Sequence, residues 1–220
     1  MKLSHLVATI SLAIACSHFS AAYAADHGSI DKVLGSASVA SNQHYNDISL
    51  VNGSLTMASN SSAKSISLVN GSIKLNNNIS IHTASTVNGS ITADGSLVVE
   101  QDLTTVNGKI QPGSNAVIGG HVETVNGDIR IENSEVGRNI TTVNGDITLD
   151  GNSVVKGDIV YKPRGKRKSF FGWNNNEKPV LRIAANAVVE GNIVLQQEVE
   201  LQLANAALQD KIIYQINDGR

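Results

Sequence analysis

The stretch TTVNGKIQPGSNAVIGGHVETVNGDI, residues 104–129, contains the tripeptide Val-Asn-Gly twice. The tripeptide recurs along the chain at intervals of 18 or 19 residues, beginning at Val51, Val69, Val87, Val106, Val125 and Val143. Such a fixed period marks a repeat protein with structurally equivalent units. An aliphatic residue stands two positions after each glycine, and another often follows at the next alternate position. This alternation is typical of a strand with one buried face.

A second pattern lies between the tripeptides, where short apolar runs are interrupted by glycines, as in residues 117–122 and 136–140. We therefore expect three strands of about six residues per coil, separated by glycine corners. The units are too short for repeats of two helices, and the consensus of leucine-rich repeats is missing. The sequence predicts an all-β fold, a single-stranded β-helix (β-solenoid) of 18–19-residue coils stacked about 4.8 Å apart.

The Asn-Gly pairs of the tripeptide are predicted to be structural. Asparagine followed by glycine suits the positive φ values of a tight corner, and stacked asparagines can form an amide ladder. These structural positions are Asn52, Gly53, Asn70, Gly71, Asn88, Gly89, Asn107, Gly108, Asn126, Gly127, Asn144 and Gly145. The residue before valine is a threonine in the central coils, at positions 86, 105, 124 and 142, which predicts a hydroxyl ladder on an adjacent edge.

The first 24 residues are predicted to be a signal peptide. Lys2 precedes an apolar run, and the small-x-small sequence at residues 22–24 suits cleavage after Ala24. We therefore expect an exported protein in the periplasm, at the cell surface or outside the cell. In an alternative interpretation, the lipobox-like sequence ending at Cys16 makes the chain a lipoprotein.

The remaining chain is expected to hold three parts. Residues 25–47 are predicted to form an N-terminal cap, residues 48–203 the β-solenoid, and residues 204–220 a C-terminal cap. Within residues 200–215 the spacing of apolar residues favours a final strand followed by a short capping helix. Caps are expected because an open stack ends in unpaired strand edges.

The repeat is interrupted at residues 161–179, which are predicted to form an inserted loop. The insertion carries six basic residues and one acid, whereas the chain as a whole has a net charge of −2. Candidate residues for binding a partner or membrane are Lys162, Arg164, Lys166, Arg167, Lys168, Phe170, Phe171 and Trp173. Cations beside aromatic rings suit an anionic envelope surface or a glycan. Alternatively, the rings fold back onto the solenoid.

The best candidate for chemistry is the position after the repeat glycine, where Asp128 and Asp146 lie one coil apart. Lys109 and Arg130 are expected nearby. Paired acids could share a proton or a calcium ion, as polysaccharide-cleaving β-helices require, or they form a solvated face. The histidines occupy no common repeat position, so we assign no catalytic residue, metal or cofactor. The slightly acidic charge also disfavours a general nucleic-acid binder.

The later coils, residues 155–159 and 181–193, resemble bactofilins, which are polymer-forming β-helical proteins of bacteria. The Val-Asn-Gly coils look more like the adhesin head domains of exported bacterial proteins. Together the resemblances cover roughly residues 48–200. They imply a non-enzymatic structural or adhesin-like protein that presents a repetitive surface and associates with itself, end to end or laterally. An export signal departs from bactofilins, which are typically cytosolic, and a carbohydrate-binding or polysaccharide-cleaving protein is the alternative.

Overall fold

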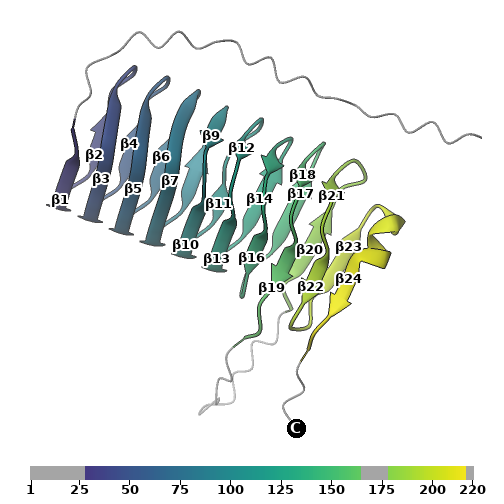
Figure 1. Ribbon diagram of the computed structural model, residues 1–220. Helices are drawn as coiled ribbons and strands as arrows, with labels where there is room; N and C mark the ends of the chain where they lie inside the picture. The colour runs from purple at the N-terminus through teal and green to yellow at the C-terminus, as the bar shows by residue number, and fades with distance from the viewer. Residues whose placement is uncertain (1–27, 165–177, 217–220) are drawn as a thin grey trace, which may run out of the picture.

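The computed structural model describes residues 28–164 and 178–216, which form a parallel β-solenoid (Figure 1). Every strand pair among these residues is parallel, and each strand pairs with strands of the preceding or the following coil. The predicted fold class is therefore confirmed. Coils follow one another with register offsets of 18 or 19 residues, as in Leu55↔Ile73 and Ile110↔Ile129.

One sheet holds the strand that follows each Val-Asn-Gly corner. Its nine strands, in spatial order, are β2 (Ala37–Val39), β4 (Leu55–Met57), β6 (Ile73–Leu75), β8 (Ile91–Ala93), β11 (Ile110–Gln111), β14 (Ile129–Glu132), β17 (Ile147–Asp150), β20 (Val180–Ile183) and β23 (Glu200–Leu203). The order follows the chain, because each coil contributes one strand.

The second sheet has fifteen strands and holds the remainder of each coil. In the first coils this part is formed by β1 (Ile30–Leu34), β3 (His44–Asn52), β5 (Ser62–Asn70) and β7 (Ile79–Asn88). Later coils divide it into a first strand, namely β9 (Leu97–Val99), β12 (Val117–Ile118), β15 (Glu135–Val136), β18 (Val154–Val155) or β21 (Val188–Val189), and a second strand, namely β10 (Leu103–Asn107), β13 (Val122–Asn126), β16 (Ile140–Thr142), β19 (Ile159–Tyr161), β22 (Ile193–Leu195) or β24 (Ile212–Tyr214). Three short strands per coil are thus found in the later coils only.

The division has a local cause in the first 19-residue coil. β7 pairs with β9 at an offset of 18 residues, as in Ile79↔Leu97, but with β10 at an offset of 19, as in Ala84↔Leu103. The additional residue falls between β9 and β10, so the continuous strand of the earlier coils is broken there.

The core lies between the two sheets and extends along the whole stack. Residues of the first sheet alternate between buried and solvent-facing positions, so that one column of the core contains Leu55, Ile73, Ile91, Ile110, Ile129, Ile147 and Leu181. Each of these side chains is completely buried, which is worth about 1.5–3 kcal/mol per aliphatic residue. The period-two pattern seen in the sequence therefore specifies which residues face inward.

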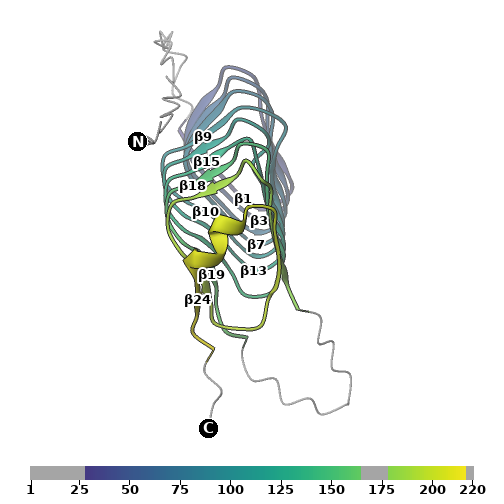
Figure 2. The ribbon, with the colours of Figure 1, turned by 90° about the vertical axis from the view of Figure 1, so that its right-hand side faces the viewer.

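The two ends of the described solenoid differ. Residues 28–47, in the segment expected to be an N-terminal cap, contain β1 and β2, which already pair in parallel with the next coil, so stacking begins before residue 48. At the other end, β23 is followed by a 3-10 helix, η1 (Ala206–Lys211), which lies across the last coil (Figure 2). Asn205 caps η1 and Leu208 is buried beneath it. The predicted strand followed by a short helix is confirmed, and β24 returns the chain to the second sheet.

Across residues 28–164 and 178–216, the structure contains no helix with the length and apolar character needed to cross a bilayer.

Candidate functional site

The Val-Asn-Gly corner forms one edge of the solenoid, which we call the Val-Asn-Gly edge. Its glycines are packed against the backbone of the preceding coil: a Cβ atom on Gly71 or Gly89 would overlap the carbonyl oxygen of the preceding repeat glycine. Glycine is therefore required by close approach of neighbouring coils. The prediction that the repeat asparagines adopt positive φ is wrong. That conformation belongs to asparagines at another corner of the coil, including Asn60 (φ 61°) and Asn78 (φ 57°).

The predicted amide ladder is confirmed. Each repeat asparagine donates from Nδ2 to Oδ1 of the asparagine one coil earlier, at 2.9 Å for Asn70 to Asn52 and 2.8 Å for Asn88 to Asn70. The bonds continue through Asn107, Asn126 and Asn144 at 2.8–2.9 Å. Because one donor and one acceptor of each interior amide are used in the ladder, one N–H and part of the oxygen's capacity remain directed to solvent.

The threonines before the repeat valines face inward, not along an outer edge as the sequence suggested. Thr86, Thr105 and Thr124 are buried, and their hydroxyl groups donate to the carbonyl oxygens of repeat glycines at 3.0–3.1 Å. The hydroxyl row thus satisfies the backbone of the corner. Among the described residues, the buried side-chain oxygen or nitrogen that lacks such a partner is Oγ1 of Thr142, beside the insertion.

The repeat valines face solvent. Val51, Val69, Val87 and Val106 are 39–41 % exposed. At the corner both Val51 and Asn52 point outward, so the alternation of the strand is broken there. We call the outward strip the valine ribbon; it contains Val51, Val69, Val87 and Val106, with Ser49, Ser67, Ser85 and Thr104 on one side and Asn52, Asn70, Asn88 and Asn107 on the other.

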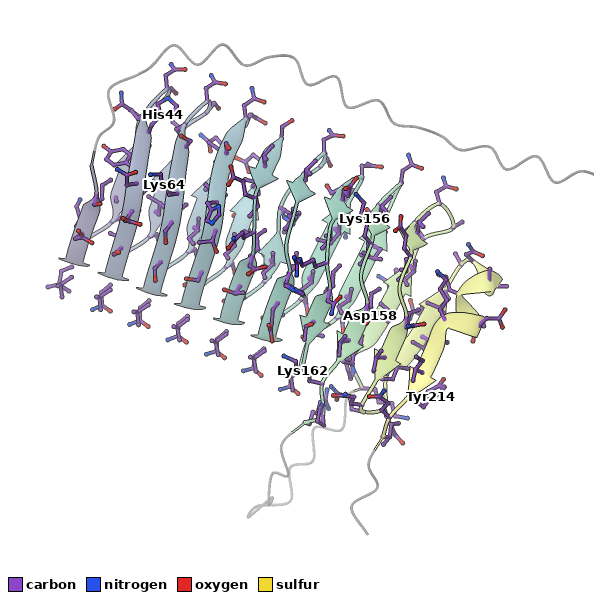
Figure 3. The ribbon with its side chains drawn as sticks, in the orientation of Figure 1. His44, Lys64, Lys156, Asp158, Lys162 and Tyr214 are labelled. Carbon is purple, nitrogen blue, oxygen red and sulfur yellow. The ribbon has the colours of Figure 1, made fainter. Side chains whose placement is uncertain are left out.

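The insertion leaves the solenoid from this same edge. Tyr161 pairs with Thr142 in the ladder and so occupies the buried threonine position. The backbone N–H of Lys162 donates to Thr142 O, which places Lys162 in the column of the repeat valines. Lys162 and Tyr214 accordingly lie near each other at the C-terminal part of the edge, whereas His44 and Lys156 lie away from it (Figure 3).

Tyr161 closes the stack where the insertion begins. In a regular coil the N–H of Ile129 donates to the carbonyl of Asp146 in the next coil. At the insertion the corresponding groups are bridged by the Tyr161 hydroxyl, which accepts from Ile147 N at 3.1 Å and donates to Val180 O at 3.0 Å. The ring is completely buried, and this burial raises the pKa of the phenol far above its ordinary value. The hydroxyl therefore stays protonated and able to donate.

Polar side chains complete this closure. Nε2 of Gln197 donates to Val143 O at 2.5 Å and to Lys162 O at 2.8 Å, and Oδ1 of Asp146 accepts from Val180 N at 2.8 Å. Both margins of the insertion are also held by ion pairs with the solenoid, Lys162–Glu123 at 2.5 Å and Lys178–Glu198 at 3.1 Å. Exposed pairs of this kind add about 0–1 kcal/mol each, so they orient the margins more than they stabilise them.

Two of the eight candidate binding residues lie in the described part of the chain: Lys162, which is paired with Glu123, and the exposed Arg164. The others, Lys166, Arg167, Lys168, Phe170, Phe171 and Trp173, lie outside the described residues. Beside the insertion's first residues, an open hollow of about 650 Å³ is lined by Pro163, Gln196, Tyr214, Gln215 and Ile216.

The carboxylates considered for chemistry have a structural role. Oδ1 of Asp128 accepts from Asp146 N at 3.0 Å, just as Asp146 accepts from Val180 N. The serines at the same repeat position act identically in earlier coils, with Ser54 Oγ accepting from Ser72 N at 3.2 Å. The two aspartates therefore continue a backbone-capping row, and the shallow groove of about 190 Å³ beside them is lined by Lys109, Ile110, Gln111, Asp128, Ile129, Arg130, Asp146 and Thr148.

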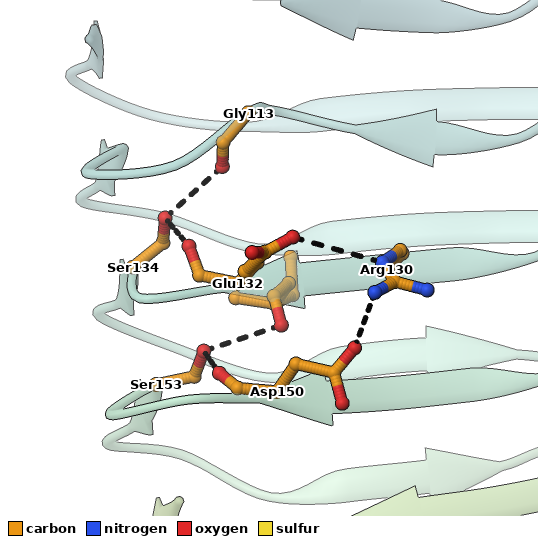
Figure 4. A network of polar contacts seen from close by, with 7 residues as sticks. Gly113, Arg130, Glu132, Ser134, Asp150 and Ser153 are labelled. Atoms are coloured by element: carbon orange, nitrogen blue, oxygen red, sulfur yellow. Dashed lines mark hydrogen bonds and ion pairs between the residues drawn. The ribbon is translucent and has the colours of Figure 1, made fainter. Parts of the chain in front are cut away.

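Arg130 belongs to a separate network on the neighbouring column (Figure 4). Its guanidinium contacts Asp150 at 2.6 Å and Glu132 at 3.9 Å. The backbone carbonyls of these two acids also accept from Ser134 and Ser153, whose hydroxyls are held in the turn that follows the strand. Both acids are thus paired with the cation, and the sequence gave no sign of this because the partners lie in different coils.

The described histidines are dispersed, as expected. His82 contacts Glu100 at 2.8 Å, and His121 Nδ1 accepts from Asn139 N at 3.3 Å in a second backbone-capping row. Within residues 28–164 and 178–216, no group of three or more His, Cys, Asp or Glu side chains could hold a metal ion.

A scan against protein-family models and searches of curated proteins and solved structures find no match to this chain. The resemblance to bactofilins and adhesin heads therefore supports the β-solenoid fold alone.

Proposed function

We propose that the protein is an exported, non-enzymatic scaffold that presents its basic and aromatic insertion to an anionic surface of the bacterial envelope. The observation that carries this proposal is the Tyr161 bridge, which allows an insertion to leave the Val-Asn-Gly edge while the coils on either side stay stacked. A rigid stack on both sides of an insertion suits display better than catalysis.

The use of polar groups supports the same proposal. Asp128, Asp146 and His121 accept hydrogen bonds from the backbone of neighbouring coils, so their lone pairs already serve the stack. The insertion, in contrast, concentrates six of the chain's cations against one acid. Such a cluster is attracted by anionic lipid headgroups or anionic polymers, and its aromatic residues suit an interface.

Binding to vesicles tests the proposal. Residues 25–220 should co-sediment with vesicles of phosphatidylcholine and phosphatidylserine, weakly with phosphatidylcholine alone, and less as salt is raised. Replacing Lys166, Arg167 and Lys168 with glutamine should abolish most of the binding. The matched control replaces three exposed solenoid lysines, Lys64, Lys74 and Lys109, with glutamine and should bind nearly as well. Equal loss in both variants would contradict a role for the insertion.

Assembly into filaments is not part of this proposal. η1 covers the C-terminal coil, and Lys211 Nζ donates to the carbonyls of Val189 and Glu190 in the second sheet. A head-to-tail stack would have to displace these contacts, whereas bactofilin-like polymerisation needs exposed terminal coils.

A further inference from the structure

The valine ribbon is an apolar surface without a partner in the described structure, and it is unusual in its regularity. Its four valines are each about 40 % exposed and are repeated at the coil spacing, about 4.8 Å. Isolated exposed valines need no explanation, but a continuous row of them does. Nothing in the packing of the core requires valine here, because these side chains face solvent.

The ribbon carries no charge. Its three columns contain serine or threonine, valine and asparagine in the four coils from Ser49 to Asn107. Charged residues enter these columns only at the next coil, where Glu123 occupies the serine column and pairs with Lys162. The ribbon is therefore matched to an uncharged partner, unlike the insertion at the other end of the same edge.

Hydrogen-bonding capacity runs along the ribbon at the same spacing. Each interior ladder asparagine retains one N–H and part of the capacity of its carbonyl oxygen, and the serine and threonine hydroxyls form the opposite border. A ligand that fills the ribbon must thus offer both donors and acceptors at each step, together with an apolar face for the valines.

The dimensions favour a thin chain over a protein. The ribbon is roughly 15–20 Å long and about 10 Å wide from the coil and strand spacings, which gives about 200 Å². A stable protein interface buries roughly 800 Å² on each partner. A second copy of the chain would gain too little area, whereas one extended polymer chain would be covered along its full width.

We infer that the valine ribbon binds an extended, neutral polysaccharide lying along the stack. Pyranose rings present apolar C–H faces toward the valines, and their hydroxyl groups both donate and accept toward the amides and hydroxyls on either side. Each coil contributes a weak contact, so affinity should rise with the number of sugar residues until the ribbon is covered. This inference does not depend on the proposed role of the insertion.

Isothermal titration of residues 25–220 with cellobiose, cellotetraose and cellohexaose tests the length dependence. Cellohexaose should bind at least about tenfold more tightly than cellobiose, and dextran, whose α-linked chain is not extended in the same way, should not bind. No binding of cellohexaose, equal affinity for all three oligosaccharides, or equal binding of dextran would overturn the inference.

A pair of variants locates the site. Val69→Glu with Val87→Glu places charge in the middle of the ribbon and should weaken cellohexaose binding by about tenfold or more. The control, Val98→Glu with Val188→Glu, changes two valines of similar exposure, 47 % and 48 %, outside the ribbon and should leave binding unchanged. Both variants alter exposed positions, and circular dichroism melts verify their folding. If Val69→Glu with Val87→Glu instead abolishes self-association while no glycan binds, the partner is a second copy and the inference fails.

Discussion

The Val-Asn-Gly edge is built in two ways. From Val51 to Asn144 the same three residues recur in every coil, and neighbouring copies satisfy one another through the amide ladder and the buried threonines. Beyond Asn144 the tripeptide is lost, and Tyr161 and Gln197 reach between coils to satisfy the backbone. The comparison teaches that this corner can be held either by repetition or by dedicated long side chains, and that only the second arrangement admits an insertion.

The largest difference should come from the glycines of the regular half. We expect Gly89→Ala to destabilise the protein by more than about 3 kcal/mol, because its Cβ would overlap backbone of the preceding coil, which cannot move independently. Urea denaturation measures the change. Gly95→Ala is the control: there the nearest atom belongs to the Asn77 side chain, which can rotate away. Similar losses in both variants would argue against close coil approach as the reason for the repeat glycines.

The insertion half should depend most on Tyr161. Tyr161→Phe keeps the ring but removes the hydroxyl that bridges Ile147 N and Val180 O, and we expect a loss of about 2–3 kcal/mol. Tyr45→Phe provides a matched removal of a phenolic hydroxyl in the regular half. Unchanged stability of Tyr161→Phe would mean that the two backbone groups pair directly once the hydroxyl is gone.

Alkaline pH tests the same bridge without altering the core. The raised pKa of Tyr161 means that the folded state holds the neutral phenol, whereas the phenol of the unfolded chain ionises near pH 10. Its contribution to the unfolding free energy is complete below about pH 10 and declines as pH rises further. Stability should therefore fall above about pH 10 more steeply in the natural protein than in Tyr161→Phe, as followed by urea melts. Parallel pH profiles would show that Tyr161 is not held neutral.

The amide ladder should contribute less per residue, because it is exposed. Asn88→Ala removes two side-chain hydrogen bonds and should cost about 1 kcal/mol, whereas Asn52→Ala, at the first rung, removes one and should cost about half as much. Thermal melts of the two variants compare an interior rung with an end. A larger effect at Asn52 than at Asn88 would be incompatible with a simple additive ladder.

The smallest effect is expected at the aspartates of the capping row. Asp146→Asn retains the oxygen that accepts from Val180 N, so stability should change by less than about 0.5 kcal/mol, and Asp146→Ala should cost about 1 kcal/mol. A polysaccharide-cleaving activity that is present in the natural protein and lost in Asp128→Asn with Asp146→Asn would contradict the structural role assigned here.

Much of this architecture could be predicted from the sequence, since the period of Val-Asn-Gly specifies the coil, and the alternation after each glycine specifies the buried residues. The asparagine ladder followed from register alone. The directions of Thr86 and Val87 could not be predicted, because at the corner two consecutive residues face outward and the period of two no longer applies. Nor could the Tyr161 bridge, whose partners lie 14 and 19 residues away on either side of the chain's direction.

The amide ladder also gives the solenoid an electrical direction. Each of its bonds runs from Nδ2 of one coil to Oδ1 of the coil before it, so the side-chain dipoles from Asn52 to Asn144 all point the same way. The backbone bonds of a sheet largely cancel, but aligned amides add, as the peptide groups of a helix do. The N-terminal end of this row presents the free N–H groups of Asn52 and the other end the carbonyl oxygen of Asn144, so the two ends of the row carry partial charges of opposite sign.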